Sequence, residues 1–439
     1  MGGVRIAIIN MPCRTDAAPN IVPLGIYYLG NAIRKQLSTH QVEIEYVDLN
    51  LVRPITASAI RRNLGSVLDA DLFLLSGLIT TLQWQAYVTR LIKQWNKKAR
   101  VVTGGGLATN LGPELADWIN VDAVAVGEGE NTIGQILEDF TANRLKVLYG
   151  DGPVRALDDW TMNWSDVVGI EQYAKTPIWG KDAGNSSYSA TDQTRSLNMI
   201  TSRGCPMECG FCSREATGGR IYRTRSAAAV LEEVNLLVDQ YQVGFIGFMD
   251  DNMCAKKDRM YEICDGLIPL AERGLRWGCH ARFDMYQELP EFMARAGCRH
   301  IGFGAESASE KILKAMKKKQ SPQRMREMIE RCRQAGIHPN CTWIMGWPGE
   351  DFDDLLETVR FILDVAPENK NMFVATAYPG TDLWLQVEDQ ILAHYRDKRS
   401  YVEALGDATL PLMNYSAMSN SVFKCAHRFI QAGQLGRLL

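Results

Sequence analysis

Residues 196–212 read SLNMITSRGCPMECGFC, in which an apolar run typical of a buried strand is followed at once by three cysteines. Cys205, Cys209 and Cys212 are spaced as C-x3-C-x2-C. Thiolates held this close together would repel one another without a cation. The stretch therefore predicts a metal-binding loop directly after a strand.

The segments that follow this loop alternate between strand-like and helix-like patterns. We expect strands at residues 244–250, 276–282, 300–306, 340–346 and 371–377, with helices such as 226–241, 321–336 and 351–363 between them. Parallel strands joined by right-handed crossovers close toward a barrel, whose chemistry gathers where the strands end. The sequence therefore predicts a partial (β/α)6 TIM-like barrel over residues 196–385 and a helical C-terminal tail over residues 386–439.

Residues 1–150 show the same alternation ahead of the barrel, with strands expected within residues 4–10, 42–50, 71–78, 99–106 and 121–130, which predicts a doubly wound α/β domain of Rossmann-like type. The glycine-rich turns Gly104–Gly106 and Gly127–Gly129 follow two of its expected strands, where ligands of such sheets bind. Glycines at these positions can also serve only to close tight turns. Residues 151–195 lose the alternation and are rich in Gly, Ser, Asp and Thr, which is typical of a linker.

The composition is that of an ordinary globular protein, with 46% hydrophobic and 23% charged residues. No apolar stretch approaches the ~20 residues of a membrane span and no secretory leader is evident, so we expect a cytoplasmic protein without membrane contact. The formal net charge is −3 without a basic cluster, which argues against a nucleic-acid partner. The 11 cysteines are an odd number, and most are expected to be buried thiols.

Two kinds of metal site fit three clustered cysteines. A structural zinc site closes with four protein ligands, and no histidine lies in the motif or near it in sequence to complete one. An iron–sulfur cubane normally takes four cysteines, so three of them leave one iron open to another ligand. We favour the cubane, because the missing fourth cysteine then provides a binding position.

The cysteine motif after the first barrel strand, with Phe211 ahead of the last cysteine, resembles the radical S-adenosylmethionine (radical SAM) superfamily. The resemblance implies a [4Fe–4S] cluster on the three cysteines, with the open iron chelated by the amino and carboxylate groups of SAM. It further implies reductive cleavage of SAM to a 5′-deoxyadenosyl radical, which takes a hydrogen atom from the substrate. A non-enzymatic iron–sulfur sensor or scaffold is the alternative from another class of protein.

Further residues match family positions that contact SAM, each near the end of an expected strand. The segment MDDN departs from the family's usual Gly-Gly-Glu, so the resemblance leaves open whether Asp250 or Asp251 accepts from the SAM ammonium. Arginine, glutamate and serine side chains are suited to bind the carboxylate and the ribose hydroxyls of SAM. The candidate cofactor-binding residues are Phe211, Asp250, Asp251, Arg282, Glu306, Ser307 and Gly346.

The first domain resembles the cobalamin-binding-type domain that precedes the barrel in one large branch of the same superfamily. The resemblance lies in the order of PLGIYYLG, the glycine-rich turn and VGEGE. The Asp-x-His-x-x-Gly motif by which many cobalamin proteins supply a lower ligand is absent, and His40 is the only histidine before residue 200. The sequence therefore does not favour bound cobalamin, although this type of domain allows it.

The whole chain is most similar to the radical SAM diol dehydratase of aminoglycoside antibiotic biosynthesis, a lyase that dehydrates the amino sugar paromamine before a partner reductase acts. The resemblance implies an external electron donor and a protein acid; Tyr222 is the candidate acid, with packing as its other interpretation. Asp284 and Glu350 are candidates to bind ammonium groups of the sugar. A cobalamin-dependent radical SAM methyltransferase is the alternative. A methylthiotransferase is excluded, because only Cys13 precedes the motif and a second cysteine cluster would be needed.

Overall fold

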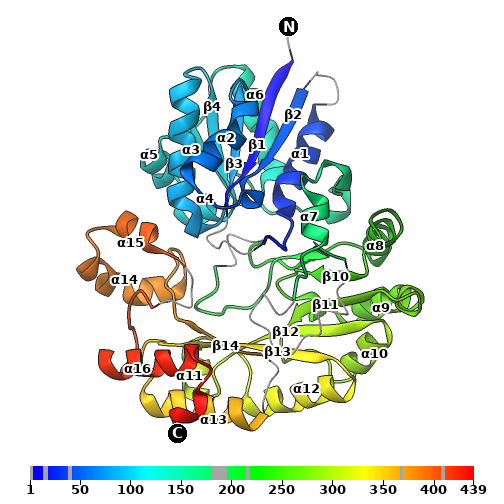
Figure 1. Cartoon of the computed structure of the whole chain (residues 1–439), viewed down its shortest axis with the longest axis vertical. Coiled ribbons are helices and arrows are strands. Elements are labelled where there is room, and N and C mark those ends of the chain that lie inside the picture. Colours follow the sequence, from blue (N-terminus) through cyan, green and yellow to red (C-terminus); the bar gives the residue numbers. More distant parts are fainter. Residues whose placement is uncertain are drawn as a thin grey trace.

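The computed structural model describes residues 3–12, 18–37, 42–179, 195–213, 218–365, 369–406 and 411–439. Within these ranges the chain forms two six-stranded parallel sheets and one two-stranded ribbon. The first sheet and its helices occupy one end of the molecule, and the second sheet occupies the other (Figure 1). The predicted fold class, a doubly wound domain followed by a partial barrel, is confirmed.

The first sheet has the strand order β2-β1-β3-β4-β5-β6. All its pairs are parallel, and the chain extends from β1 in both directions, as in doubly wound sheets. The sequence predicted every strand except β6, which has only three residues. The strands are β1 (Val4–Asn10), β2 (Val42–Asp48), β3 (Leu72–Ser76), β4 (Arg100–Gly104), β5 (Ala123–Val126) and β6 (Leu148–Gly150); the helices are α1 (Leu24–Gln36), α2 (Ala57–Leu64), α3 (Leu82–Trp95), α4 (Gly105–Leu111), α5 (Glu114–Ile119) and α6 (Gly129–Thr141).

Strand β1 shows why this segment folds as an inner strand. Ile6, Ala7, Ile8 and Ile9 are all fully buried, so both faces of the strand are covered. Ile6 and Ile8 belong to the core that contains α1 and α6, whereas Ala7 and Ile9 belong to the core on the opposite face. The continuous apolar run in the sequence is the signature of this double coverage.

The second sheet has the strand order β14-β13-β12-β11-β10-β7, which is the chain order read backwards. Because β7 and β14 are its two edges, the curled sheet is a half-barrel. All six strands lie where the sequence predicted them. The strands are β7 (Ser196–Met199), β10 (Phe245–Phe248), β11 (Arg276–Ala281), β12 (Cys298–Glu306), β13 (His338–Met345) and β14 (Asn369–Val374); the helices are α8 (Ala227–Tyr241), α9 (Lys257–Glu272), α10 (Leu289–Arg295), α11 (Glu310–Ala315), α12 (Pro322–Gln334) and α13 (Phe352–Val365).

The end of the predicted linker fills the inside of the half-barrel. A Cβ atom on Gly247 would lie 2.8 Å from Ile178 Cδ1, and one on Gly278 would lie 2.6 Å from Trp179 Cζ3. Trp179 also stacks on His300 with ring centroids 4.3 Å apart. The two glycines are therefore needed for the close approach of this segment to the sheet.

A two-stranded antiparallel ribbon, β8 (Ser202–Arg203) and β9 (Arg223–Thr224), and a short linker helix, α7 (Ile170–Ala174), were not predicted from the sequence. Three helices, α14 (Asp382–His394), α15 (Lys398–Ala404) and α16 (Asn420–Gln431), follow the last barrel strand. Helix α15 returns to the first domain, where Lys398 Nζ contacts Glu114 at 3.1 Å. None of the helices in the described ranges is long and apolar enough to cross a membrane.

Candidate active site

The three cysteines lie on one loop, residues 204–213, which leaves β8 and is followed by β9; we call it the cysteine loop. Cys209 is 8% exposed, Cys205 is partly buried and Cys212 is exposed. Arg282 Nη1 lies 3.9 Å from Cys209 Sγ. Within the described ranges, no three His, Cys, Asp or Glu side chains are grouped to hold a single metal ion. Three cysteines on one loop beside a guanidinium fit an anionic iron–sulfur cluster.

The backbone of the cysteine loop is fixed from two sides. Gly210 N donates to Met316 O at 2.9 Å, and Leu383 N at the start of α14 donates to Gly210 O at 2.9 Å. Cys212 N closes a turn onto Cys209 O at 3.1 Å. The loop is therefore held in place by segments more than a hundred residues away in the chain.

The structure separates the two neighbouring aspartates that follow β10. Asp250 is 2% exposed and accepts hydrogen bonds from Thr201 N (2.6 Å), Thr201 Oγ1 (2.5 Å) and Ser202 Oγ (2.6 Å). Asp251 instead lines the large cavity described below, and its side chain is exposed to it. Burial and the charge of Asp250 raise the pKa of Asp251. Asp250 is therefore committed to holding the start of the cysteine loop, whereas Asp251 is open to a ligand.

Two cationic side chains lie beside the cysteine loop. Arg282 Nε donates to Asp284 Oδ1 at 3.0 Å, so Asp284, predicted to bind substrate, orients the guanidinium that contacts Cys209. Lys318 pairs with Glu306 at 2.9 Å, both side chains being only 7% exposed, and its ammonium lies 5.7 Å from the centre of the Phe211 ring. Three residues predicted to bind the cofactor therefore lie near the cysteines, and the sequence did not single out Lys318.

Glu306 has an unusual backbone conformation, with φ of +66° at a register shift between β12 and β13. This region is unfavourable for a residue with a side chain, and such conformations are concentrated at functional sites. The conformation places the carboxylate against Lys318 rather than along the strand. The strained residue therefore belongs to the group of charged side chains beside the cysteine loop.

Three other predicted residues are directed elsewhere. Ser307 is fully buried and its Oγ lies 3.1 Å from Thr358 Oγ1 of α13, so a role for this side chain in binding the cofactor stays a prediction. Gly346, with φ of +89°, donates its N–H to Glu350 Oε2 at 2.5 Å, so only its carbonyl is left for a ligand. Glu350 is fully buried, and its role in binding an amino sugar stays a prediction. Its carboxyl group closes the turn after β13.

Glu350 should make the stability of the protein depend on pH. Burial raises the pKa of its carboxyl to about 8, from an ordinary value of 4.5, so the group stays protonated in the folded chain while it ionises in the unfolded chain. Its contribution to stability is therefore complete below pH ~4.5 and is lost as the pH rises through ~8, by up to about 1.4 kcal/mol per pH unit. We expect thermal unfolding to show a larger drop in melting temperature between pH 6 and 8.5 for the parent than for Glu350→Gln.

The matched control is Glu310→Gln, which changes an exposed carboxylate of α11 and should keep the pH dependence of the parent. An equal drop in melting temperature for the parent and Glu350→Gln would contradict the assignment.

Tyr222 lies beside the ribbon and not on the wall of the large cavity. Its hydroxyl donates to Met253 O at 3.3 Å, and Lys256 Nζ lies 5.9 Å from the ring centre. Burial raises the pKa of this phenol to about 12. The structure therefore favours the packing interpretation of Tyr222, and its role as a proton donor stays a prediction.

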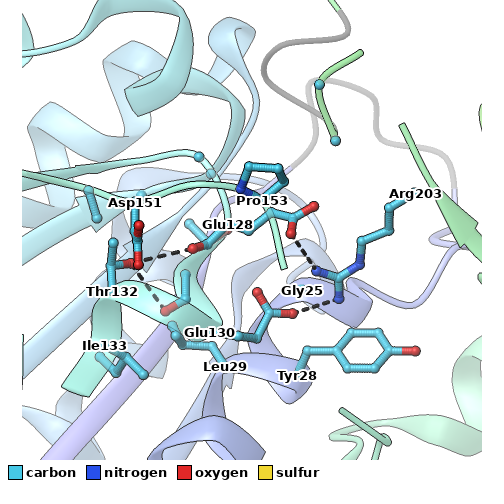
Figure 2. Close-up of a pocket in the computed structure, with 18 of the residues that line it drawn as sticks. Gly25, Tyr28, Leu29, Glu128, Glu130, Thr132, Ile133, Asp151, Pro153 and Arg203 are labelled. Atoms are coloured by element: carbon cyan, nitrogen blue, oxygen red, sulfur yellow. Dashed lines mark hydrogen bonds and ion pairs between the residues drawn. The ribbon is translucent and has the colours of Figure 1, made fainter. Parts of the chain in front are cut away.

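A cavity of about 680 Å³ lies between the first sheet and the ribbon that carries the cysteine loop (Figure 2). One part is an apolar slot between the sheet and helices α1 and α6, lined by Ile26, Leu29, Leu74, Val102, Ile133 and Ile136. The strand ends contribute Ser76 and the two glycine-rich turns. The opposite wall includes Ser202 and Arg203 of the ribbon and Met249 and Asp251, which follow β10. One cavity therefore joins the ligand-binding edge of the first domain to the surroundings of the cysteine loop.

The wall of this cavity carries ion-paired charges. Arg203 points toward Glu128 and Glu130, with Nη2 at 2.6 Å from Glu130 Oε1 and Nη1 at 3.7 Å from Glu128 Oε2 (Figure 2). The guanidinium also lies 5.1 Å from the ring centre of Tyr28. Burial lowers the pKa of the Arg203 guanidinium, whereas the carboxylates of Glu130 and Glu128 raise it. The effect of the carboxylates is larger, so the pKa of Arg203 is higher than usual. Sequence reasoning missed these residues, although the segment GEGE marks the position of the two glutamates.

The residues present also fit a cobalamin in this cavity. A ligand with a large apolar portion can enter the slot between the sheet and α6, and glycines at the strand ends allow close approach of a ring system to the backbone. The sequence contains no lower-ligand motif, and both Cys13 and His40 lie outside the described residues. The fit therefore rests on the shape and polarity of the slot and not on a cobalt ligand.

Comparison with known proteins supports both halves of this site. Residues 199–362 match the family model of the radical SAM superfamily, and residues 14–137 match that of the B12-binding domain. An uncharacterised methyltransferase of Pyrococcus horikoshii is 29% identical over 82% of this chain and 77% of its own length. The anaerobic magnesium-protoporphyrin IX monomethyl ester cyclase of Rubrivivax gelatinosus is 24% identical over 92% of this chain and 72% of its own length.

Among solved structures, the radical SAM methyltransferase TsrM of Kitasatospora setae, with cobalamin and a [4Fe–4S] cluster bound, has a TM-score of 0.72. It shares 15% sequence identity, and the match covers 90% of this chain and 79% of that one, so the likeness concerns the fold. The chain therefore combines a B12-binding domain over residues 14–137 with a radical SAM domain over residues 199–362. The predicted [4Fe–4S] cluster and SAM are supported by this domain, and cobalamin, which the sequence did not favour, is now the expected third cofactor.

Proposed function

We propose that the chain is a cobalamin-dependent radical SAM methyltransferase. The observation that carries the proposal is the single cavity that joins the apolar slot of the B12-binding domain to Asp251 beside the cysteine loop. The name of the Pyrococcus relative and the fold shared with TsrM support methyl transfer. The predicted dehydratase of an aminoglycoside, with its partner reductase, has no counterpart among the relatives reported above.

Each cofactor would be held by residues of this chain. When bound, the cluster and SAM supply radical formation and methyl groups, and cobalamin supplies a methyl carrier. Asp251 would accept hydrogen bonds from the SAM ammonium, and Arg282 and Lys318 would attract its carboxylate. The slot along α6 would exclude water from the buried part of the corrinoid. An external electron donor is still required to reduce the cluster.

The test uses the full chain, reconstituted anaerobically with iron and sulfide, and given SAM and a strong reductant with or without hydroxocobalamin. Methyl transfer to a carrier converts SAM into S-adenosylhomocysteine, whereas dehydration yields only 5′-deoxyadenosine and methionine. We expect cobalamin to be retained through gel filtration and S-adenosylhomocysteine to form only in its presence. Dehydration of added paromamine without cobalamin would overturn the proposal in favour of the dehydratase.

A variant that fills the cavity connects this result to the structure. A Cβ atom on Gly25, which lines the cavity, would meet no atom within 4 Å, so Gly25→Leu can fold while it narrows the slot. We expect it to weaken hydroxocobalamin binding more than about tenfold. Gly65→Leu is the matched control, because Gly65 also has free space but lies outside the cavity wall. Equal cobalamin binding by both variants would place the ligand elsewhere.

A further inference from the structure

Two arginines of the ribbon that carries the cysteine loop are paired with two glutamates at the start of α6. Arg203 contacts Glu130 at 2.6 Å and Glu128 at 3.7 Å. Arg223 forms a two-pronged pair with Glu128, with Nη1 at 2.7 Å from Oε2 and Nη2 at 2.8 Å from Oε1. We call Glu128, Glu130, Arg203 and Arg223 the interdomain clamp, since it joins the B12-binding domain to the radical SAM domain.

The clamp is buried, with side chains only 6% to 12% exposed. Buried ion pairs of this kind contribute little net stability, because desolvation offsets their attraction, but removing one partner leaves an unpaired charge. Two-pronged arginine–carboxylate pairs also have a narrow range of geometry. The clamp therefore fixes the position of one domain against the other more than it adds to the free energy of unfolding.

On one side, the clamp is joined to Cys205, the first cysteine of the motif, by a short and tightly packed stretch of backbone. Arg203 is followed directly by Gly204 and Cys205. Gly204 has φ of +82°, and a Cβ atom there would lie 2.4 Å from Ile221 O, so this backbone is tightly enclosed. Cys205 N donates to Gly219 O at 3.1 Å. A displacement of the Arg203 guanidinium is therefore transmitted to the cysteine loop.

On the other side, the clamp is connected to the cavity through a single helix. Glu128 and Glu130 flank the first residue of α6, and the next turns of the same helix line the apolar slot with Thr132, Ile133 and Ile136. A ligand in the slot packs against this face of α6 and restrains the turn that carries both glutamates. The helix is the rigid element between the slot and the ion pairs.

We propose that the interdomain clamp couples the two cofactor sites, so that a corrinoid bound in the slot increases the affinity of the cysteine loop for SAM. The inference rests on the proposed function, because it takes cobalamin as the ligand of the slot. Coupling is reciprocal by thermodynamic necessity, so SAM increases the affinity for cobalamin by the same factor. Arg203 and Glu130 act as positioning residues, since they affect SAM through the cysteine loop.

The test measures the dissociation constant of SAM by calorimetry on the cluster-loaded full chain, without reductant, in the presence and absence of hydroxocobalamin. We expect hydroxocobalamin to lower the SAM dissociation constant of the parent about fivefold or more. In Glu130→Gln and Arg203→Lys this ratio should fall to about one, with both ligands still bound. Arg203→Lys keeps the positive charge, but an ammonium group cannot bridge both glutamates, so this variant tests whether the two-glutamate geometry is needed. Glu130→Gln tests whether the ion pair itself is needed.

The control is Arg144→Gln, which breaks the pair of Arg144 Nε with Asp139 Oδ1 (2.9 Å) at the far end of the same helix and should keep the ratio of the parent. A clamp variant with the ratio of the parent, or a parent that binds hydroxocobalamin with no change in SAM affinity, would overturn the inference alone. A parent that binds no hydroxocobalamin would overturn the proposed function and the inference together.

Discussion

Cys209→Ala is expected to remove the iron–sulfur cluster and, with it, all cleavage of SAM. The parent should hold about four iron and four sulfide per chain after anaerobic reconstitution, as for a cubane. Cys209 is the most buried cysteine of the motif at 8% exposure, and it is the one in contact with Arg282. Loss of its thiolate leaves only two ligands for the cluster. Iron and sulfide analysis and mass spectrometry of 5′-deoxyadenosine measure the two effects.

The matched control for this variant is Cys425→Ala. Cys425 is an exposed free thiol on α16, away from the cysteine loop in sequence, so its removal should leave iron content and SAM cleavage unchanged. A Cys209→Ala protein that retains the iron content and SAM cleavage of the parent would refute the cluster assignment. Loss of iron in both variants would show that the effect is not specific to the motif.

The features predicted correctly from the sequence are those encoded by neighbouring residues. The run at residues 4–10 is apolar throughout because both faces of β1 are buried, and the cysteine spacing lies within eight residues. The three-residue strand β6 and the two-residue strands of the ribbon carry no periodicity of their own. They form because neighbouring segments offer hydrogen-bonding partners, which a local pattern does not reveal.

For two of the candidate site residues, contacts with distant segments determine the surroundings of the side chain. Ser307 lies at the end of a barrel strand, as predicted, but its hydroxyl group forms a hydrogen bond with Thr358, 51 residues further along the chain. Glu350 follows a strand in the same way, yet the fold buries it completely. A strand end therefore gives the position of a polar side chain, and only the packing around it decides whether the side chain faces a ligand.

The cobalamin slot was missed for a different reason. A histidine ligand is the feature that would indicate cobalamin in the sequence, whereas the slot consists of Ile, Leu and Val side chains contributed by two strands and two helices. Such residues have the same periodicity whether they pack against each other or line a cavity. Only a gap between sheet and helices, which is a property of the assembled domain, distinguishes the two cases.

The pair of variants Asp251→Asn and Asp250→Asn should separate a ligand-binding carboxylate from a structural one. Asp251 is open to the cavity and Asp250 is 2% exposed. Asp251→Asn removes one charge from a charge-assisted hydrogen bond to the SAM ammonium, so the dissociation constant of SAM should rise about 10- to 100-fold with an unchanged melting temperature. Calorimetry with SAM and thermal unfolding measure the two quantities.

Asp250→Asn should show the opposite combination, because its carboxylate accepts from Thr201 N, Thr201 Oγ1 and Ser202 Oγ and lies near the buried Arg259. The amide of the variant can accept these three hydrogen bonds through one oxygen only. It is also neutral, so it no longer compensates the positive charge of the Arg259 guanidinium. Removal of one partner of a buried pair of charges lowers the free energy of unfolding by about 3–5 kcal/mol, so the melting temperature should fall clearly. The two substitutions are chemically identical and adjacent, so each serves as the control of the other. A weaker SAM complex in Asp250→Asn at full stability, with Asp251→Asn unaffected, would reverse the assignment.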